Sequence, residues 1–364
     1  MEFPNCVSNL DTPSDFPIIP IIYGPPYDTS RPLQSIINVN PTLTIPYMQH
    51  YSFGIQHELL QNYLFEIGYV GSKGTKLPFS QNRNQALRAT PQNPIRGLND
   101  STTANLNLRV PYLGFSPTGV SEVNTGTDSR YNSLQTSITK RYSRGYQFNS
   151  SYTWSKSLDN SSGGSSSTLG SVSGDQTNLS QARGLSDFNR THRLVGTFIF
   201  DMPKFGPTAL QGWQFSGIVT MQSGLPFSIT DNTGAALYGV TSSRANWKPG
   251  ATIDTVTLSG DVRSRLNRYF DASGFDKAGN EFGNTGRNIL IGPGQSNVDF
   301  SVIKKTKMPK LESGNIEFRT EFFNLLNHTN FDTPNNNVNS STFGVISGTS
   351  NNARLIQFAL KLNF

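Results

Sequence analysis

The chain ends with Ile356-Gln357-Phe358-Ala359-Leu360-Lys361-Leu362-Asn363-Phe364, in which apolar and mostly polar side chains alternate without a break. Every even-numbered position in this stretch is apolar. Because successive side chains of a β-strand point to opposite faces, the alternation predicts a final strand with one apolar face. The stretch also finishes on an aromatic residue with no tail beyond it, which is unusual for a strand of a water-soluble domain.

The composition suits strands that are wet on one face and in contact with lipid on the other. The chain has 364 residues, enough for one large β domain or two ordinary ones. Only 35% of the residues are hydrophobic and 15% are charged, which is low for a globular enzyme. Uncharged polar residues and aromatics make up the difference, as they do in membrane-spanning β-strands. No run of about 18 apolar residues occurs, so the sequence predicts no transmembrane helix.

Eight further segments alternate in the same way and are predicted to be strands. The clearest is Tyr146–Ser155, in which an aromatic-rich face alternates with a face of Gln, Asn, Ser and Thr. The link before it, Arg141–Gly145, has the length and the final glycine expected of a hairpin. The other predicted strands lie at residues 46–57, 63–70, 131–140, 190–201, 213–222, 297–302 and 316–323.

The links between these strands alternate between short and long. The short ones are residues 58–62, 141–145, 202–212 and 304–314, and the long ones are 71–130, 156–189, 223–296 and 324–353. Several structureless loops of this length would be out of place in a compact soluble domain. They are expected in an outer-membrane barrel, which has tight periplasmic turns and long extracellular loops. The sequence therefore predicts an all-β fold, an antiparallel transmembrane β-barrel, rather than a soluble sandwich.

Aromatic residues near the strand ends agree with this orientation. With the long loops outside, Tyr146 lies at the lower interface and Tyr152 and Trp154 at the upper one, and Trp213 is assigned to the same aromatic girdle. Eight residues of a strand tilted by about 40° climb roughly 20 Å, close to the apolar band of about 25 Å in such barrels.

The strand count predicts a partial barrel. Nine strands that end in the periplasm must start outside, whereas bacterial single-chain barrels have an even strand number with both ends periplasmic. The first residues also lack a signal peptide. We therefore expect residues 1–45 to be the remnant of an extracellular loop and residues 46–364 to be the C-terminal part of a larger barrel. One further short strand at Leu33–Asn40 would raise the count to ten and alter the parity.

Several motifs resemble the barrel of TonB-dependent outer-membrane receptors of the Oar-like type. The resemblance runs from about Tyr47 to Phe364, and its motifs are Tyr131–Gln135, Tyr152–Asp159, Asp187–Arg193, Gln222–Phe227 and Arg319–His328. It implies a barrel of about 22 strands around an N-terminal plug. It also implies a TonB box, and often a carboxypeptidase-regulatory-like domain, ahead of the plug. None of these additional parts is recognisable in the sequence.

The resemblance implies energised uptake of a solute whose identity the residues do not indicate. The implied partners are the outer-membrane lipid, the barrel-assembly machinery and, through an upstream region, the TonB complex. An alternative is a surface-display or adhesion protein in which the barrel anchors long loops. A passive porin is a third possibility.

No motif indicates catalysis, a cofactor or a metal. The four histidines lack metal-ligand spacing, and a single cysteine excludes an internal disulfide. The formal net charge is +6, and the basic residues cluster around Lys140 and Lys304. Because both clusters lie at predicted hairpin ends, we interpret them as solvated turn residues rather than as a nucleic-acid site. We expect the protein not to be an enzyme.

Two groups of residues are candidate solute contacts. Asp299, Glu317, Arg319 and Glu321 share the predicted lumen-facing side of two neighbouring strands. They form either a charged wall that contacts a plug or solute, or cross-strand pairs in which the charges of a polar lumen neutralise one another. Aromatics of the longest loop form either a solute-capturing surface or the core of a folded loop. The residues selected there are Tyr238, Trp247, Tyr269 and Phe270.

The apolar side chains of the last strand are predicted to form the signal read by the barrel-assembly machinery. They are Phe358, Leu360, Leu362 and Phe364. Deleting residues 358–364 from the native gene should abolish assembly, because the final strand loses both its apolar face and its terminal aromatic. The heat-dependent mobility of the protein from isolated outer membranes measures assembly. Normal insertion of the shortened protein would contradict the prediction.

Overall fold

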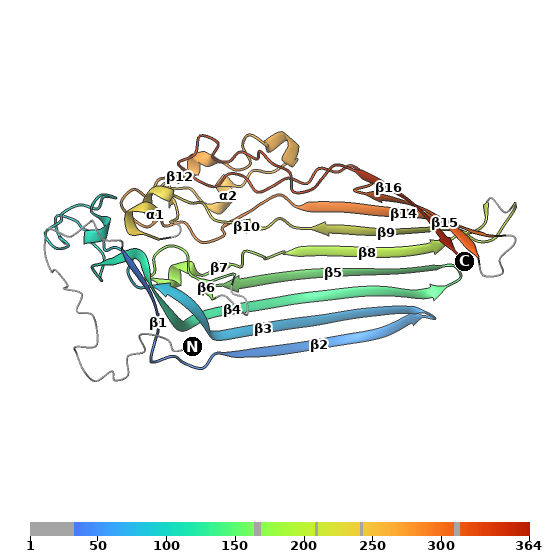
Figure 1. Cartoon of the computed structure of the whole chain (residues 1–364), viewed down its shortest axis with the longest axis horizontal. Helices are drawn as coiled ribbons and strands as arrows, with labels where there is room; N and C mark the ends of the chain where they lie inside the picture. Colours follow the sequence, from blue (N-terminus) through green and yellow to red (C-terminus); the bar gives the residue numbers. More distant parts are fainter. Residues whose placement is uncertain (1–32, 164–168, 208–209, 241–242, 309–313) are drawn as a thin grey trace, which may run out of the picture.

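Nine long strands form one antiparallel sheet in which each strand pairs with its neighbours along the chain (Figure 1). The computed structural model describes residues 33–163, 169–207, 210–240, 243–308 and 314–364. The strands are β2 (Tyr47–Leu60), β3 (Tyr63–Asn82), β4 (Phe115–Ser143), β5 (Tyr146–Asp159), β8 (His192–Asp201), β9 (Trp213–Gln222), β14 (Gln295–Lys307), β15 (Asn315–Phe323) and β16 (Leu355–Asn363). The predicted all-β antiparallel fold is confirmed. Within the described residues the sheet is open, because its edge strands β2 and β16 do not pair with each other.

The short and long connections lie at opposite ends of the sheet. The tight turns and the C-terminus share one end, and the long connections gather at the other (Figure 1). A two-residue turn joins β4 to β5 through Arg144 and Gly145, whose φ angles of 54° and 85° are those of a type I′ hairpin. The loop asymmetry predicted from the sequence is therefore present.

Strands β3 and β4 are much longer than the sequence indicated. Their pairing continues as far as Asn82 opposite Ser121, so much of the segment predicted as a loop at 71–130 is strand. The prediction failed there because the alternation is lost. Beyond Gly74 the register shifts, and the side chains of both faces contact other protein segments or water. One anchor of this extension is Phe79, which is fully buried against Val172 and Ala182 of the next long loop.

The segment before β2 contains a further short strand, as the sequence suggested, but not as an extra strand of the wall. Strand β1 (Gln34–Val39) runs parallel to the extended part of β4, with Ile36 opposite Val120. Residues 1–32 of the predicted loop remnant lie outside the described residues.

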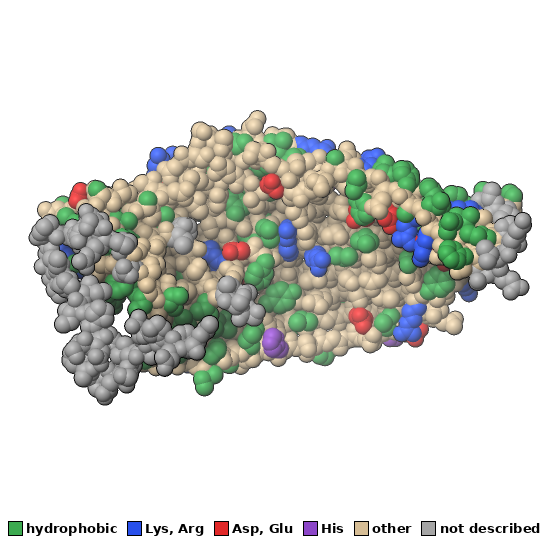
Figure 2. Space-filling model, viewed as in Figure 1, with side chains coloured by type: hydrophobic (Ala, Val, Ile, Leu, Met, Phe, Trp, Pro, Cys, Tyr) green, Lys and Arg blue, Asp and Glu red, His purple; other side chains and the backbone are tan. Residues whose placement is uncertain are grey.

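The pairing register keeps one apolar face continuous across the sheet. Phe300 of β14 packs against Phe198 and Phe215 at ring-centroid distances of 6.4 and 6.2 Å, and against Phe322 at 6.5 Å. Gly217 makes this packing possible, because a Cβ atom there would lie 2.6 Å from the ring of Phe198. This face is called the outer face below, and the opposite one the inner face. In the view of Figure 2, most of the surface over the central strands is neither apolar nor charged.

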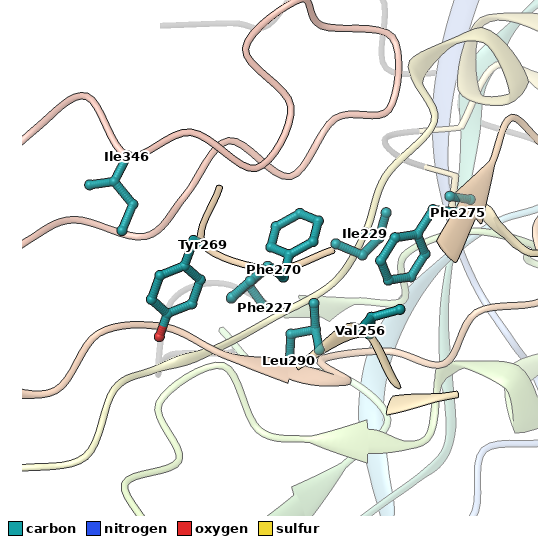
Figure 3. Packing of buried hydrophobic residues seen from close by; sticks show 9 residues of the cluster. Phe227, Ile229, Val256, Tyr269, Phe270, Phe275, Leu290 and Ile346 are labelled. Carbon is teal, nitrogen blue, oxygen red and sulfur yellow. The ribbon is translucent and has the colours of Figure 1, made fainter. Parts of the chain in front are cut away.

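The long connections fold into a cap with a hydrophobic core of its own (Figure 3). It contains the helices α1 (Asn232–Tyr238) and α2 (Ile253–Val256), and two ribbons, β10 (Pro226–Phe227) with β13 (Leu290–Ile291) and β11 (Asn246–Trp247) with β12 (Phe275–Asp276). The core residues are Phe227, Ile229, Ala245, Val256, Tyr269, Phe270, Phe275, Leu290 and Ile346. Two short strands, β6 (Gly170–Ser171) and β7 (Gly184–Leu185), join the loops to β3 and β5. Among the described residues, no helix has the length and apolar character needed to cross a membrane.

The turn between β4 and β5 generates a prediction with a matched control. Gly145 and Gly250 both have positive φ angles, 85° and 81°. A Cβ atom at Gly145 would meet the carbonyl oxygen of Asp201 at 2.9 Å, whereas nothing lies within 4 Å of one at Gly250. Both Gly→Ala variants incur left-handed strain of about 1–2 kcal/mol. Gly145→Ala should in addition disturb the β5–β8 pairing and lower the urea midpoint of the folded protein in detergent well below that of Gly250→Ala. Equal midpoints would refute this.

Candidate functional site

Charged side chains form a ladder along the inner face of β15. Arg319 lies between Glu317 and Glu321, with nitrogen–oxygen distances of 3.0 and 3.3 Å. Lys305 of β14, directly opposite Glu317, approaches the same carboxylate at 3.6 Å. The structure thus brings three of the four predicted lumen charges together and adds Lys305, which the sequence pattern had placed in a turn.

Asp299, the fourth predicted lumen charge, makes a different contact. Its carboxylate accepts hydrogen bonds from the backbone N–H of Asn324 at 2.9 Å and from the amide of Asn297 at 2.9 Å. These bonds hold the start of the loop that follows β15.

The inner face is hollowed beside this ladder. A recess of about 790 Å³ extends from β5 across β8, β9 and β14 to β15, and Asp299, Arg319 and Glu321 contribute to its wall. Gln147 and Asn149 line its β5 side. The apolar side chains of Ile199, Ile218 and Ile303 line the recess as well, so polar and apolar side chains together surround an open space.

Two lysines lie among the aromatics of the lower girdle, next to the short turns. Lys140 lies 4.2 Å from the ring centroid of Tyr146 and 5.6 Å from that of Tyr63, and it donates to the carbonyls of Arg141, Ser143 and Tyr146. It is only 3% exposed, so its interpretation as a solvated turn residue was wrong, although its place at a hairpin end was right. Cation–π contact with tyrosine and bonds to carbonyls replace its hydration.

The other girdle residues also lie at the strand ends. Lys304 of β14 contacts the ring of Trp213 of β9 at 5.3 Å, which repeats the arrangement around Lys140 elsewhere along the lower girdle. At the upper end the phenol of Tyr152 bonds Nδ1 of His192 at 2.8 Å, and the neighbouring Trp154 is largely exposed on the outer face. Aromatics at both ends of the strands, half-buried at Tyr146 and Trp213 and exposed at Trp154, are what a lipid–water interface favours.

The residues of the predicted assembly signal occupy the edge strand β16. Phe358, Leu360 and Leu362 pair with β15 opposite Thr320, Phe318 and Ile316. Phe358 stacks on Phe318 at 6.3 Å. All three, and Phe364 beyond them, are more than half exposed. Their role in assembly stays a prediction.

Most of the aromatics selected as loop contacts lie inside the cap. Tyr269 and Phe270 belong to its core (Figure 3), and Tyr238 is 1% exposed and stacks on Phe282 at 4.5 Å. Trp247 is half-buried and stacks on Phe275 at 4.9 Å. This burial favours the second of the two alternatives left open by the sequence, a packed loop core.

The sequence patterns missed the polar residues that hold the loops together. Arg287 is 8% exposed and bridges Asp159 at the end of β5 and Asp187 of the following loop, at 2.5 and 2.7 Å. Arg109 is fully buried and donates to the carbonyls of Leu87, Thr102 and Leu237, and burial lowers its pKa. No local signal distinguishes such arginines from surface ones, because their partners are distant in sequence.

Asp231 joins three segments of the cap. It caps α1 by accepting from the N–H of Thr233 at 2.9 Å, and it also accepts from Ala278 N–H at 2.7 Å and the Asn339 amide at 2.6 Å. Burial alone would raise the pKa of this carboxyl. The hydrogen bonds from Asn339, Thr233 and Ala278 outweigh burial, so the pKa lies below its ordinary value.

A polar pocket of about 300 Å³ lies among the loops. Arg244 and Arg287 line it together with several Ser, Thr and Asn side chains, among them Ser162, Ser228 and Asn336. Burial lowers the pKa of the Arg244 guanidinium, and the nearby charge of Arg287 lowers it further. Within the described residues, no group of three or more His, Cys, Asp or Glu side chains is arranged to hold a metal ion.

An antiparallel wall with an apolar outer face, a polar inner face and loops gathered at one end defines an outer-membrane β-barrel protein. A family model described as "Outer membrane beta barrel domain" matches residues 3–357, and the chain belongs to this family. The protein is accordingly located in the outer membrane.

The comparison with solved structures finds the outer membrane transporter YddB from Escherichia coli, with 12% sequence identity and a TM-score of 0.45. The match covers 91% of this chain and 34% of that one, so this chain spans about a third of its length. No curated protein matches the sequence.

The Asp231 carboxylate predicts an acid-sensitive cap. Because its pKa is lowered in the folded state, its stabilisation is complete above the unfolded value of about 4 and is lost as the pH falls through the folded value. Cleavage of the loops by pepsin should therefore accelerate as the pH falls below about 4. Asp231→Asn should weaken the pH dependence of this cleavage. It should also lower the stability of the cap by about 2 kcal/mol or more at pH 7, since an amide cannot accept all three hydrogen bonds.

The exposed Asp254 of α2 provides the control for this experiment, because Asp254→Asn changes the same charge in the same loop without touching the buried bonds. An unaltered pH profile in Asp231→Asn, or an equal change in Asp254→Asn, would rule out the assigned role.

Proposed function

We propose that this barrel wall belongs to a TonB-dependent receptor of the Oar-like type that takes up a solute across the outer membrane. The observation that carries the proposal is the recess of about 790 Å³ on the inner face, flanked by the Glu317–Arg319–Glu321 ladder. A small barrel fills its interior with side chains, whereas a wide one leaves room for a channel or a plug. Ion pairs that face open space are expected in a wide barrel.

The curvature of the sheet supports a wide barrel. Barrels of about eight strands already close on themselves. Here nine strands follow one another and β2 still does not meet β16 within the described residues. The wall is therefore curved for a larger cylinder, with space for a plug that couples uptake to energy from the TonB complex.

The loop pocket supplies a plausible first contact for the solute. Its two arginines and its hydroxyl and amide groups favour a polar solute with hydroxyl or acidic groups. In this scheme the solute first binds in the cap and then passes along the polar inner face. The chain itself carries out no chemical step.

A second candidate function is surface display or adhesion, with the barrel as anchor. The observation that favours it is the cap itself, since a packed core and the extended β3–β4 hairpin make the exposed part a stable body rather than a set of loose loops. An adhesion protein requires a cap of this kind but no polar recess in its wall.

The dependence of solute uptake on the proton gradient distinguishes energised transport from adhesion. Uptake of a panel of labelled oligosaccharides, peptides and ferric siderophores is measured in the native bacterium, in a strain lacking the gene, and in the native strain with a protonophore. We expect at least one solute to accumulate only when both the gene and the proton gradient are present. Uptake that ignores the protonophore would indicate a passive pore. Loss of surface attachment without any loss of uptake would indicate adhesion.

A further inference from the structure

Three cations stand in a group on the outer face, directly beyond the upper aromatic girdle. Lys73 of β3 is paired with Arg130 of β4, and Lys156 of β5 is paired with Asn132, two positions along β4 from Arg130. Arg130 and Asn132 lie on the same face of β4 because their spacing is two. All three cationic side chains are exposed.

In the part of the chain that the structure describes, these cations have no paired counter-charge. Directly opposite residues have Cβ atoms about 4.5–5.5 Å apart, and like charges in such positions destabilise a sheet. Within the described residues, neither Lys73, Arg130 nor Lys156 forms an ion pair. The nearest carboxylate along the same face of β4 is Asp128, two positions from Arg130, and it accepts instead from the N–H of Lys76. The arrangement is therefore suited to an external anion.

Asn132 provides a fourth polar group at the same place. The phenols of Tyr51 and Tyr69 both donate to its Oδ1, at 2.9 and 2.8 Å. These bonds orient the amide so that its NH₂ group has no acceptor among the described residues. An oriented donor beside two or three cations is a common arrangement for binding a phosphate.

An apolar groove adjoins the cations. It has a volume of about 790 Å³, and its wall includes Lys156 and Asn132. The apolar part of the wall comes from Leu134, Trp154 and Leu158 of the sheet and from Leu185 and Ile291 of the loops. Trp154 and Ile291 are exposed apolar residues. The groove thus offers room for hydrocarbon beside the cations on the outer face, since Leu158 lies directly opposite Arg130.

We propose that this patch binds a phosphorylated, acylated lipid of the outer leaflet, with its phosphate at Lys73, Arg130, Lys156 and Asn132 and an acyl chain in the groove. A free phosphate ion would satisfy the cations but leave the apolar groove empty, so the pairing of the two features selects a lipid. The height of the patch agrees, since headgroups lie just outside the aromatic girdle. This binding is independent of the proposed transport function.

The test measures binding of phosphorylated lipid A to the native protein extracted from outer membranes, in detergent with a chelator to exclude metal bridges. Its dephosphorylated form and inorganic phosphate are the comparison probes. Replacing all three cations (Lys73→Gln, Arg130→Gln, Lys156→Gln) should weaken lipid A binding by roughly tenfold or more. The wild type should prefer lipid A to its dephosphorylated form, and inorganic phosphate at the same concentration should not displace it.

A control variant removes the same charge elsewhere. Lys204, Arg263 and Lys277 are exposed cations outside the patch, and replacing all three by Gln should leave lipid binding unchanged. Equal loss in both variants, equal affinity of the wild type for the two lipids, or displacement by inorganic phosphate would overturn the proposal. If the triple variant fails to assemble, two other measurements replace it: lipid A binding by Arg130→Gln, and the salt dependence of lipid A binding by the wild type. A contact between a cation and a phosphate must weaken as the salt concentration rises. Salt-independent binding would overturn the proposal as well.

Discussion

The backbone of a chain in lipid must satisfy its own hydrogen bonds, and the rest of this structure follows from that requirement. An unsatisfied N–H or C=O group in hydrocarbon costs several kcal/mol, so a strand can lie there only beside another strand. The seven inner strands meet this condition on both edges by pairing with their neighbours along the chain, and the edge strands β2 and β16 meet it on one edge within the described residues. Once the pairing is set, the period of two decides which side chains meet lipid and which meet water. The stacked Phe198, Phe300 and Phe322 are one product of that register.

The same requirement explains how much of the fold could be predicted from the sequence. Inside the membrane each strand must be apolar on one face, so a few alternating residues are enough to identify segments such as Tyr146–Asp159 as strands. Above the membrane neither face of a strand has to meet lipid, so the alternation is not enforced, and the extension of β3 to Asn82 left no readable pattern although it still pairs with β4. Of the candidate site, the ladder at Glu317, Arg319 and Glu321 was visible because three charges share one face of one strand. Arg287 and Asp231 were invisible because they bind residues far away in the sequence, Asp159 in the case of Arg287 and Asn339 in the case of Asp231.

Two different forces therefore stabilise the two halves of the molecule. The wall relies on hydrogen-bonded pairing and contact with lipid, and in its edge strands β2 and β16 the apolar side chains are exposed. The cap relies on burial in the ordinary way, with Ile229, Val256 and Phe270 removed from water almost completely. Buried polar residues such as Arg109 and Asp231 then connect segments that the apolar core does not reach.

The enclosure of Lys140 has a consequence for the placement of the whole wall. Its ammonium group is bound to three carbonyls and two tyrosine rings, so it cannot swing toward water as lysines at a membrane edge usually do. With the side chain unable to adjust, the depth of this hairpin in the membrane is set by the backbone itself. Adjustment to a bilayer that thickens or thins locally is therefore left to the exposed Arg141 and Arg144 of the same turn, because Lys140 cannot follow it.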